Sequence, residues 1–304
     1  MADLLDLIQS GNLPELAKPQ ATHSSVQSVG DAASSAVDFY GVYTGKAPKL
    51  TAIGYLPVDK YMGGVNHDQL VVFAARPGVG KSWFALNCAM RAARLNSQRV
   101  AYLTLEDGLA ITGVRALAIA SKLDESEIRL HSTRNTLTQP KLDLLQTGLR
   151  SLADVPLSIY APESSDGLRV LNTLRYASEE GAQLVFIDYL QYMRGGQDRN
   201  GIDDILNGLV EFAKSTKIPV VVVSQLRRPR EDPKDRSSND EGEGGSVPKL
   251  VELKGSGSLE EKGKVVVGLW GTVEKIQTKV LKTNIGRAGV GANFTLCNGF
   301  FEPL

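Results

Sequence analysis

Short apolar runs and longer amphipathic stretches alternate along the chain from about residue 50 onward. Runs that are largely apolar are typical of strands buried on both faces of a parallel sheet. Four of them are Leu70–Ala74, Arg99–Leu105, Leu184–Ile187 and Val220–Val223. The stretches between them predict helices over Lys81–Leu95, Ala110–Ser121, Leu168–Glu179 and Ile202–Thr216. The alternation predicts an α/β domain with right-handed crossovers.

The last third of the chain predicts three more strands, over Val265–Trp270, Ile276–Lys282 and Asn293–Cys297. Only short connections separate them, so we expect them to be antiparallel and to lie at one edge of the sheet. The predicted architecture is therefore a mainly parallel sheet with antiparallel edge strands at the C-terminal end.

Residues 1–50 differ from the rest of the chain, and we expect them to form a separate part from the domain over 51–304. An apolar face over residues 3–17 predicts a short amphipathic helix, and the polar stretch Gln20–Ser35 predicts a flexible linker. This helix either packs on its own domain or docks on a neighbouring subunit.

The composition of the 304 residues is that of an ordinary globular protein, with 42% hydrophobic and 22% charged residues. No apolar run is long enough to span a bilayer, Met1–Lys18 does not resemble a secretory signal, and there are only 2 cysteines. These features predict a cytoplasmic protein with no membrane partner.

The charges balance, with 34 basic and 34 acidic residues, so any contact with nucleic acid requires a local basic patch. The segment Arg227–Pro248 offers one. It has almost no apolar residue, and it begins with a basic cluster that includes Arg227, Arg228 and Arg230. A loop of this length is either functional or merely solvated.

A phosphate-binding loop follows the first predicted strand and opens the first predicted helix. Its residues are Ala75, Arg76, Pro77, Gly78, Val79, Gly80, Lys81 and Ser82. The glycines let backbone N–H groups point at phosphates, the lysine adds a positive charge, and the serine is a ligand for Mg²⁺. Ala75 replaces the first glycine of the motif and fits if its backbone angles are ordinary. The motif predicts a nucleoside triphosphate site.

Three polar side chains follow other predicted strands, at the edge where α/β sheets bind ligands. Asp188 can hold Mg²⁺ through water beside Ser82, or it caps a helix. Glu106 can activate a water molecule, or it is an ordinary loop acid next to Asp107 as an N-cap. Gln225 can bond the γ-phosphate, or Ser224 and Gln225 are a capping pair.

The sequence resembles the ATPase domain of DnaB-type replicative helicases, a family of RecA-like hexameric motors with a P-loop NTPase core. The resemblance covers about residues 50–303 and rests on the phosphate loop and four further motifs. These motifs are Thr104-Leu105-Glu106-Asp107, Ile187-Asp188-Tyr189-Leu190-Gln191, Ser224-Gln225-Leu226 and Lys254-Gly255-Ser256-Gly257-Ser258-Leu259-Glu260. Gly54, Leu56, Asp59, Gly63 and Gly64 resemble the segment that leads into the domain.

The resemblance implies that ATP and Mg²⁺ bind between subunits of a ring and that single-stranded DNA passes through its centre. It implies that Glu106 is the catalytic glutamate, that Gln225 senses the γ-phosphate, and that the N-terminal helix docks on the next subunit. Lys282 would reach the ATP site of a neighbouring subunit. Lys254, Gly255 and Gly257 would contact the DNA backbone together with the basic cluster.

Three departures from the family accompany the resemblance. The DNA-contacting stretch reads Lys254-Gly255-Ser256-Gly257 and lacks the usual acidic residue. Asn284 stands where the family has an arginine finger, and Arg287 is the candidate to replace it. Strand alternation would place Lys282 on the same face as Asn284. About 50 residues before the domain are too few for the family's collar domain or primase. We therefore expect a minimal helicase encoded by a phage, plasmid or bacterium, with primase or other replisome proteins as partners.

Two other functions fit the same motifs. A recombinase or recombination mediator would form filaments on DNA instead of rings. An ATP switch that loads a helicase or serves the replisome would hydrolyse ATP slowly, and Asn284 at the finger position keeps this alternative open. A small-molecule kinase is disfavoured, since no lid for an acceptor substrate is evident.

Overall fold

The computed structural model describes residues 28, 29, 33, 51–55, 58–60, 65, 66, 68–193, 199–226, 246–253, 256–284, 286–297 and 299–304. The chain divides into two units, Met1–Lys49 and Leu50–Leu304, and the sheet and its helices belong to the second. The helix expected over residues 3–17 lies outside the described residues. None of the helices within the described ranges is both long and apolar enough to cross a membrane.

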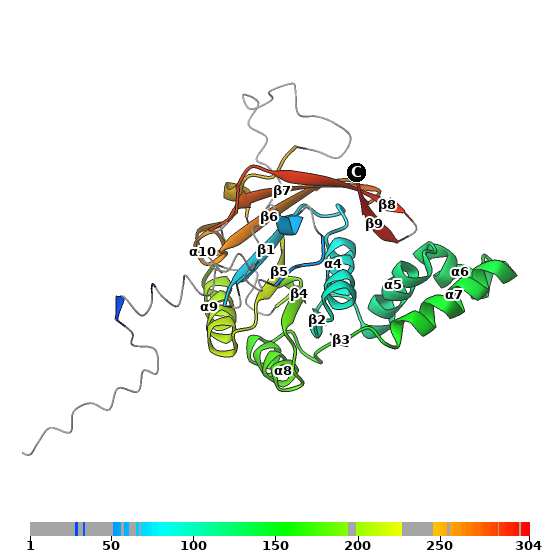
Figure 1. Cartoon of the computed structure of the whole chain (residues 1–304), viewed down its shortest axis with the longest axis horizontal. Helices are drawn as coiled ribbons and strands as arrows, with labels where there is room; N and C mark the ends of the chain where they lie inside the picture. Colours follow the sequence, from blue (N-terminus) through cyan, green and yellow to red (C-terminus); the bar gives the residue numbers. More distant parts are fainter. Residues whose placement is uncertain are drawn as a thin grey trace, which may run out of the picture. The chain divides into compact units, whose positions relative to one another are not determined.

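A nine-stranded sheet forms the centre of the domain, in the order β3-β2-β4-β5-β1-β6-β7-β8-β9 (Figure 1). The parallel strands are β1 (Leu70–Ala75), β2 (Val100–Thr104), β3 (Leu157–Tyr160), β4 (Leu184–Asp188), β5 (Val220–Gln225) and β6 (Val265–Gly271). The antiparallel strands are β7 (Lys275–Lys282), β8 (Gly291–Cys297) and β9 (Phe300–Pro303). The predicted fold, with its antiparallel C-terminal edge, is confirmed.

The register of the parallel strands brings the candidate residues into one row. Ala75 at the end of β1 is paired with Gln225 at the end of β5, and Thr104 at the end of β2 is paired with Asp188 at the end of β4. Since β2, β4, β5 and β1 are adjacent and parallel, their carboxyl ends share one edge of the sheet.

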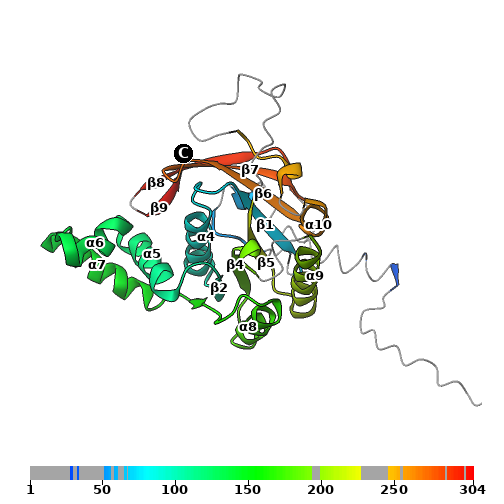
Figure 2. The same cartoon turned by 180° about the vertical axis from the view of Figure 1, so that it is seen from behind.

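Helices cover both faces of the sheet (Figure 2). One face packs on α4 (Lys81–Asn96) and α5 (Leu109–Ser121), and the other packs on α8 (Gly167–Glu179), α9 (Arg199–Thr216) and α10 (Ser256–Lys262). The central strands β1, β2, β4 and β5 are buried along nearly their whole length, which explains their apolar sequences.

The last strands of the sheet pack against α4. Phe84 of α4 lies 5.3 Å from Phe294 of β8 and 5.7 Å from Phe301 of β9, measured between ring centroids. Tyr55, in the lead-in segment, stacks on the same ring at 5.3 Å. This aromatic cluster anchors the helix that begins at the phosphate loop.

Two side chains fix the lead-in segment. The Asp59 carboxylate accepts hydrogen bonds from the backbone N–H groups of Ile53 and Gly54 at 2.7 and 3.1 Å. Arg91 of α4 donates from Nε to the Gly54 carbonyl at 2.8 Å. Burial raises the pKa of Asp59 to about 6. Two residues of the lead-in resemblance, Gly54 and Asp59, therefore have a structural role, while Leu56, Gly63 and Gly64 lie outside the described residues.

Several elements were not predicted from the sequence. They are β3, β9, α10, α6 (Glu125–Arg134), α7 (Gln139–Leu152) and the 3-10 turns η1 (Leu190–Tyr192) and η2 (Leu250–Glu252). Together α5, α6 and α7 form an arm that projects from the sheet in both views (Figures 1 and 2).

Candidate active site

The phosphate loop joins β1 to α4 in the expected conformation. Gly78 and Gly80 have φ angles of 82° and 91°, in the left-handed region that favours glycine. Ala75 is the last residue of β1 and has ordinary strand geometry, so the first position of the motif does not require glycine here. Gly80 is the N-cap of α4, and the first turn of this helix contains no acidic residue. The N-terminal amides can therefore receive an anion.

Ser82 and Asp188 come together at the start of α4 and the end of β4. Ser82 Oγ donates to Asp188 Oδ1 at 3.1 Å, and the Tyr102 hydroxyl donates to Asp188 Oδ2 at 2.8 Å. Burial raises the pKa of Asp188, and the hydrogen bonds from Tyr102 and Ser82 oppose that rise. Tyr102 is a site residue that the sequence analysis missed. Its only signal was a hydroxyl in the middle of a largely apolar strand.

These oxygen atoms suit Mg²⁺, which binds to one or two protein oxygens and completes its shell with water and phosphate. Among the described residues, no three His, Cys, Asp or Glu side chains form a group that could hold a metal ion. The oxygen atoms of Ser82 and Asp188 fit a magnesium ion that binds together with a nucleotide.

Glu106 lies directly beyond β2, close to the phosphate-loop lysine. Lys81 Nζ is 3.9 Å from Glu106 Oε2 and 4.2 Å from the centroid of the Tyr189 ring. The Lys81 side chain is 15% exposed and the Glu106 side chain 44% exposed, so the carboxylate can reach water while the lysine is largely enclosed. Tyr189, which the sequence analysis did not single out, forms one side of this group.

A tight turn holds Glu106 in place. Thr104 Oγ1 donates to the Asp107 carbonyl at 2.6 Å, and the Asp107 carboxylate pairs with Arg115 of α5. Asp107 is not the N-cap of α5, because Gly108 occupies that position. Arg115 Nε also lies 3.7 Å from Glu125 of α6. One arginine thus connects the turn to the helical arm.

We expect Arg115→Ala to lower the free energy of unfolding by about 2 kcal/mol, because it leaves the little-exposed Asp107 carboxylate without an ion-pair partner and leaves Glu125 paired only with the exposed Arg129. Arg129→Ala is the matched control. Arg129 pairs with the same Glu125 at 3.2 Å but is 54% exposed, so its loss should cost less than about 0.5 kcal/mol. Urea unfolding followed by circular dichroism measures both variants, and equal losses would contradict this ranking.

Gln225 ends β5, and its backbone is held by an amide from the motif that contains Asp188. Gln191 Oε1 accepts from the Gln225 N–H at 2.8 Å, and Gln191 Nε2 donates to Ser224 Oγ at 2.8 Å. The next N–H, of Leu226, donates to the Ala75 carbonyl at 2.8 Å. The end of β5 is thereby fixed to both the Asp188 motif and the phosphate loop.

A cavity of about 470 Å³ lies beside the phosphate loop. It is bounded by the loop itself, from Arg76 to Val79, and by the turn between β6 and β7, from Trp270 to Val273. Trp270, which the sequence analysis also missed, offers an aromatic side chain to a planar ligand group.

The residues predicted to act on a neighbouring subunit lie at the end of β7 and beyond. The Lys282 ammonium donates to the Glu260 carbonyl of its own chain. The strand ends at Lys282, so the expectation that alternation carries it and Asn284 to the same face is wrong, because Asn284 lies in a bend. Arg287 is exposed and forms no ion pair with any described residue.

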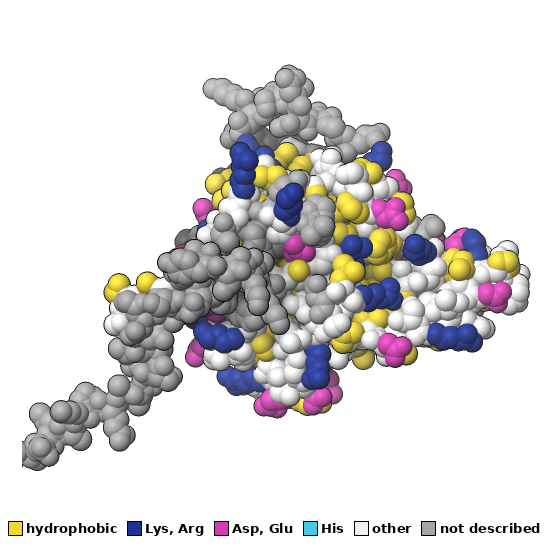
Figure 3. Space-filling model, viewed as in Figure 1, with side chains coloured by type: hydrophobic (Ala, Val, Ile, Leu, Met, Phe, Trp, Pro, Cys, Tyr) yellow, Lys and Arg dark blue, Asp and Glu magenta, His cyan; other side chains and the backbone are white. Residues whose placement is uncertain are grey.

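Most residues predicted to contact DNA lie outside the described part of the chain. These are Arg227, Arg228, Arg230, Lys254 and Gly255. Gly257 is described, and it is exposed in the first turn of α10. On the face shown in Figure 3, Lys and Arg side chains are spread over the surface and do not gather in one patch.

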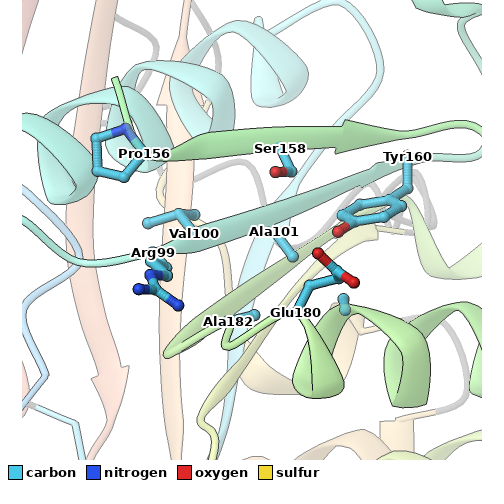
Figure 4. Close-up of a pocket in the computed structure, with 9 residues that line it drawn as sticks. Arg99, Val100, Ala101, Pro156, Ser158, Tyr160, Glu180 and Ala182 are labelled. Atoms are coloured by element: carbon cyan, nitrogen blue, oxygen red, sulfur yellow. The ribbon is translucent and has the colours of Figure 1, made fainter. Parts of the chain in front are cut away.

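A second cavity has a volume of about 240 Å³. It lies between β2, β3 and the end of α8, with Glu180 close to Tyr160 and Arg99 beside Ala182 (Figure 4). It contains none of the predicted site residues.

Comparisons with known proteins agree with the fold and with the family resemblance. The family of DnaB-like helicase C terminal domains matches residues 51–285. The chain is 27% identical to the replicative DNA helicase DnaC of Bacillus subtilis (strain 168), over 71% of this chain and 46% of that protein. It is 29% identical to the replicative DNA helicase DnaB of Pasteurella multocida (strain Pm70), over 71% of this chain and 45% of that protein. The chain spans about half the length of these relatives.

Two solved structures have the same fold. One is an ATPase domain that superposes with a TM-score of 0.77 at 20% identity, over 92% of this chain and 99% of that one. The other is a DnaB-like replicative helicase, described with its interactions with primase. It superposes with a TM-score of 0.73 at 22% identity, over 87% of this chain and 66% of that one.

Proposed function

We propose, since the chain belongs to the family of DnaB-like helicase C terminal domains, that it hydrolyses ATP to move along single-stranded DNA. The observation that carries the proposal is the row of groups at the carboxyl ends of four adjacent strands. The phosphate loop follows β1, Gln225 ends β5, Asp188 ends β4 and Glu106 follows β2. A replicative motor of this kind would work in the cytoplasm.

In this proposal each residue of the row has one task. Lys81 and the loop amides bind the β- and γ-phosphates of ATP. Glu106 accepts a proton from the water that attacks the γ-phosphorus in line, while the bond to the bridging oxygen of ADP breaks. Gln225 contacts the γ-phosphate and reports its loss. Ser82 and Asp188 would hold Mg²⁺, which supplies charge neutralisation on the phosphates when it is bound.

We propose that the active unit is a ring of six subunits, as in the hexameric helicases that the sequence resembles. Among the described residues, the arginines nearest the site are already paired, Arg115 with Asp107 and Arg76 with Glu252. Arg287 of a neighbouring subunit would supply the charge for the transferred phosphoryl group, with Lys282 close to it. The hydrogen bond from Lys282 to a carbonyl of its own chain favours Arg287 as the acting residue. Primase and other replisome proteins are the proposed partners of the ring.

Contact with DNA is proposed to be local and directed at the backbone, through Lys254, the amides of Gly255 and Gly257, and the basic cluster Arg227, Arg228 and Arg230. We expect affinity for single-stranded DNA to fall steeply with salt and to depend little on sequence. Lys254→Ala should reduce the slope of log affinity against log salt by about one charge per subunit contact.

Fluorescence anisotropy with labelled poly-dT and a mixed-sequence strand at several salt concentrations measures this slope. Lys217→Ala, which removes a lysine that precedes β5, is the matched control and should leave the slope unchanged. An unchanged slope in Lys254→Ala would show that this residue does not neutralise a DNA phosphate. In the same titration, a wild type without affinity for single strands would refute the proposed function.

A further inference from the structure

One arginine of the phosphate loop, Arg76, binds a separate part of the chain. Arg76 Nη1 donates to the Ser246 carbonyl at 2.9 Å, and Nη2 donates to Ser246 Oγ at 3.2 Å and to Glu252 Oε2 at 2.8 Å. The side chains of Arg76 and Glu252 are only 16% and 13% exposed. A planar guanidinium that binds two residues at once, with little access to water, fixes their relative positions.

The stretch 246–253 that receives Arg76 is also attached to the sheet at its other end. Leu253 forms an antiparallel bridge with Leu226, the residue after Gln225. Leu226 in turn donates its N–H to the Ala75 carbonyl at 2.8 Å. The stretch is therefore linked to the phosphate loop twice, by Arg76 directly and by the end of β5.

The position of this stretch in the sequence indicates what its link to the phosphate loop could do. It follows the segment with the basic cluster at 227–230, and it directly precedes Lys254, Gly255 and Gly257. One group of residues proposed to contact DNA thus precedes the stretch that Arg76 binds, and the other group follows it. A shift of the phosphate loop on nucleotide binding would be carried by the ion pair to the base of both DNA-contacting segments.

We propose that Arg76 is a positioning residue that couples nucleotide binding to single-stranded DNA binding through its ion pair with Glu252. The inference rests on the proposed function. Coupling between two sites is reciprocal, so ATP should change the affinity for DNA by the same factor by which DNA changes the affinity for ATP. Typical couplings amount to about 5- to 150-fold, and the ion pair should carry a large part of this factor.

Glu252→Gln tests the proposal, because it keeps the size of the side chain and removes the charge that Arg76 binds. The affinity for labelled single-stranded DNA is measured with and without a non-hydrolysable ATP analogue, and the affinity for the analogue is measured with and without DNA. We expect the analogue to bind the variant alone within about twofold of wild type, while both coupling factors fall together by about fivefold or more.

Two further variants keep the test decisive. Ser246→Ala removes only the weaker side-chain bond and should reduce the coupling less than Glu252→Gln. Glu211→Gln changes an exposed glutamate on α9 and should leave the coupling unchanged. Wild-type coupling in a folded Glu252→Gln protein would overturn the inference and leave the proposed function intact. A wild type whose affinity for DNA does not respond to nucleotide would overturn the inference too, and a wild type that does not bind DNA would overturn both.

Discussion

Glu106→Gln protein is expected to bind ATP as tightly as wild type and to turn it over at least ~10²-fold more slowly, the scale of general-base catalysis. The amide keeps the shape of the side chain and can still form hydrogen bonds, but it cannot take the proton of the attacking water. Glu106 is the acidic side chain beside Lys81, at 3.9 Å, and its 44% exposure leaves it open to water. Steady-state phosphate release and equilibrium binding of a fluorescent ATP analogue separate the two effects.

Lys81→Ala provides the contrast, because it removes the charge that binds phosphate and should impair binding as well as turnover. Glu179→Gln, at the exposed end of α8, is the matched control for the charge change and should behave as wild type. Wild-type turnover by Glu106→Gln would remove Glu106 from the mechanism. A loss of ATP binding in that variant would give it a binding role instead.

Arg287→Ala is expected to lower turnover by ~10³-fold, at the lower end of the range for arginine fingers, with little change in ATP affinity. The charge of such a group matters most in the transition state. Arg287 is exposed and follows Gly286, so it is free to approach a neighbouring subunit. Asn284 carries no charge, and Lys282 is bound to the Glu260 carbonyl.

Mixing the two inactive proteins tests whether Arg287 acts between subunits. In rings that combine Arg287→Ala with Glu106→Gln subunits, some interfaces pair an intact Glu106 with an intact Arg287, so part of the activity should return. The control is a mixture, in the same ratio, of Arg287→Ala protein with protein that carries both Lys81→Ala and Arg287→Ala. No interface in this mixture has an intact Arg287, so its activity is the level expected without complementation. Normal hydrolysis by Arg287→Ala in the presence of DNA would exclude Arg287 as the finger.

The central strands were predictable from the sequence because both of their faces are buried. The structure extends the predicted runs at β1, β4 and β5 by one or two residues each, to Ala75, Asp188 and Gln225. These are the candidate site positions themselves. At β4 and β5 the additional residues are polar, so they fall outside the apolar runs from which the strands were predicted.

Most of the strands and helices that were missed bury few of their residues. The edge strand β3 has only four residues and none of them is buried, and β9 ends in a proline. In α6 no residue is buried, and in α7 only Gly148 is. The two strands have only four residues each, which is too short for a clear alternation. In α7, however, Leu142, Leu145, Leu149 and Leu152 recur at helical spacing, so this helix was predictable from the sequence and was overlooked.

The individual candidate positions of the site could be predicted, whereas the contacts that hold them could not. A strand followed by a phosphate loop and acids at other strand ends is a local signal. In contrast, the pairs Tyr102–Asp188 and Arg76–Glu252 join residues 86 and 176 positions apart. Only the fold brings these pairs together.

The central claim, that ATP hydrolysis drives movement along a single strand, is tested most directly by displacement of streptavidin from biotinylated single-stranded DNA. We expect wild-type protein with ATP to displace streptavidin from one end of the strand and not from the other. Glu106→Gln protein, which binds ATP without hydrolysing it, should displace none. Two results together would contradict the motor function. They are that wild-type protein displaces no streptavidin from either end, and that it hydrolyses ATP very slowly even with saturating DNA. The ATP switch would then be the better account of the protein.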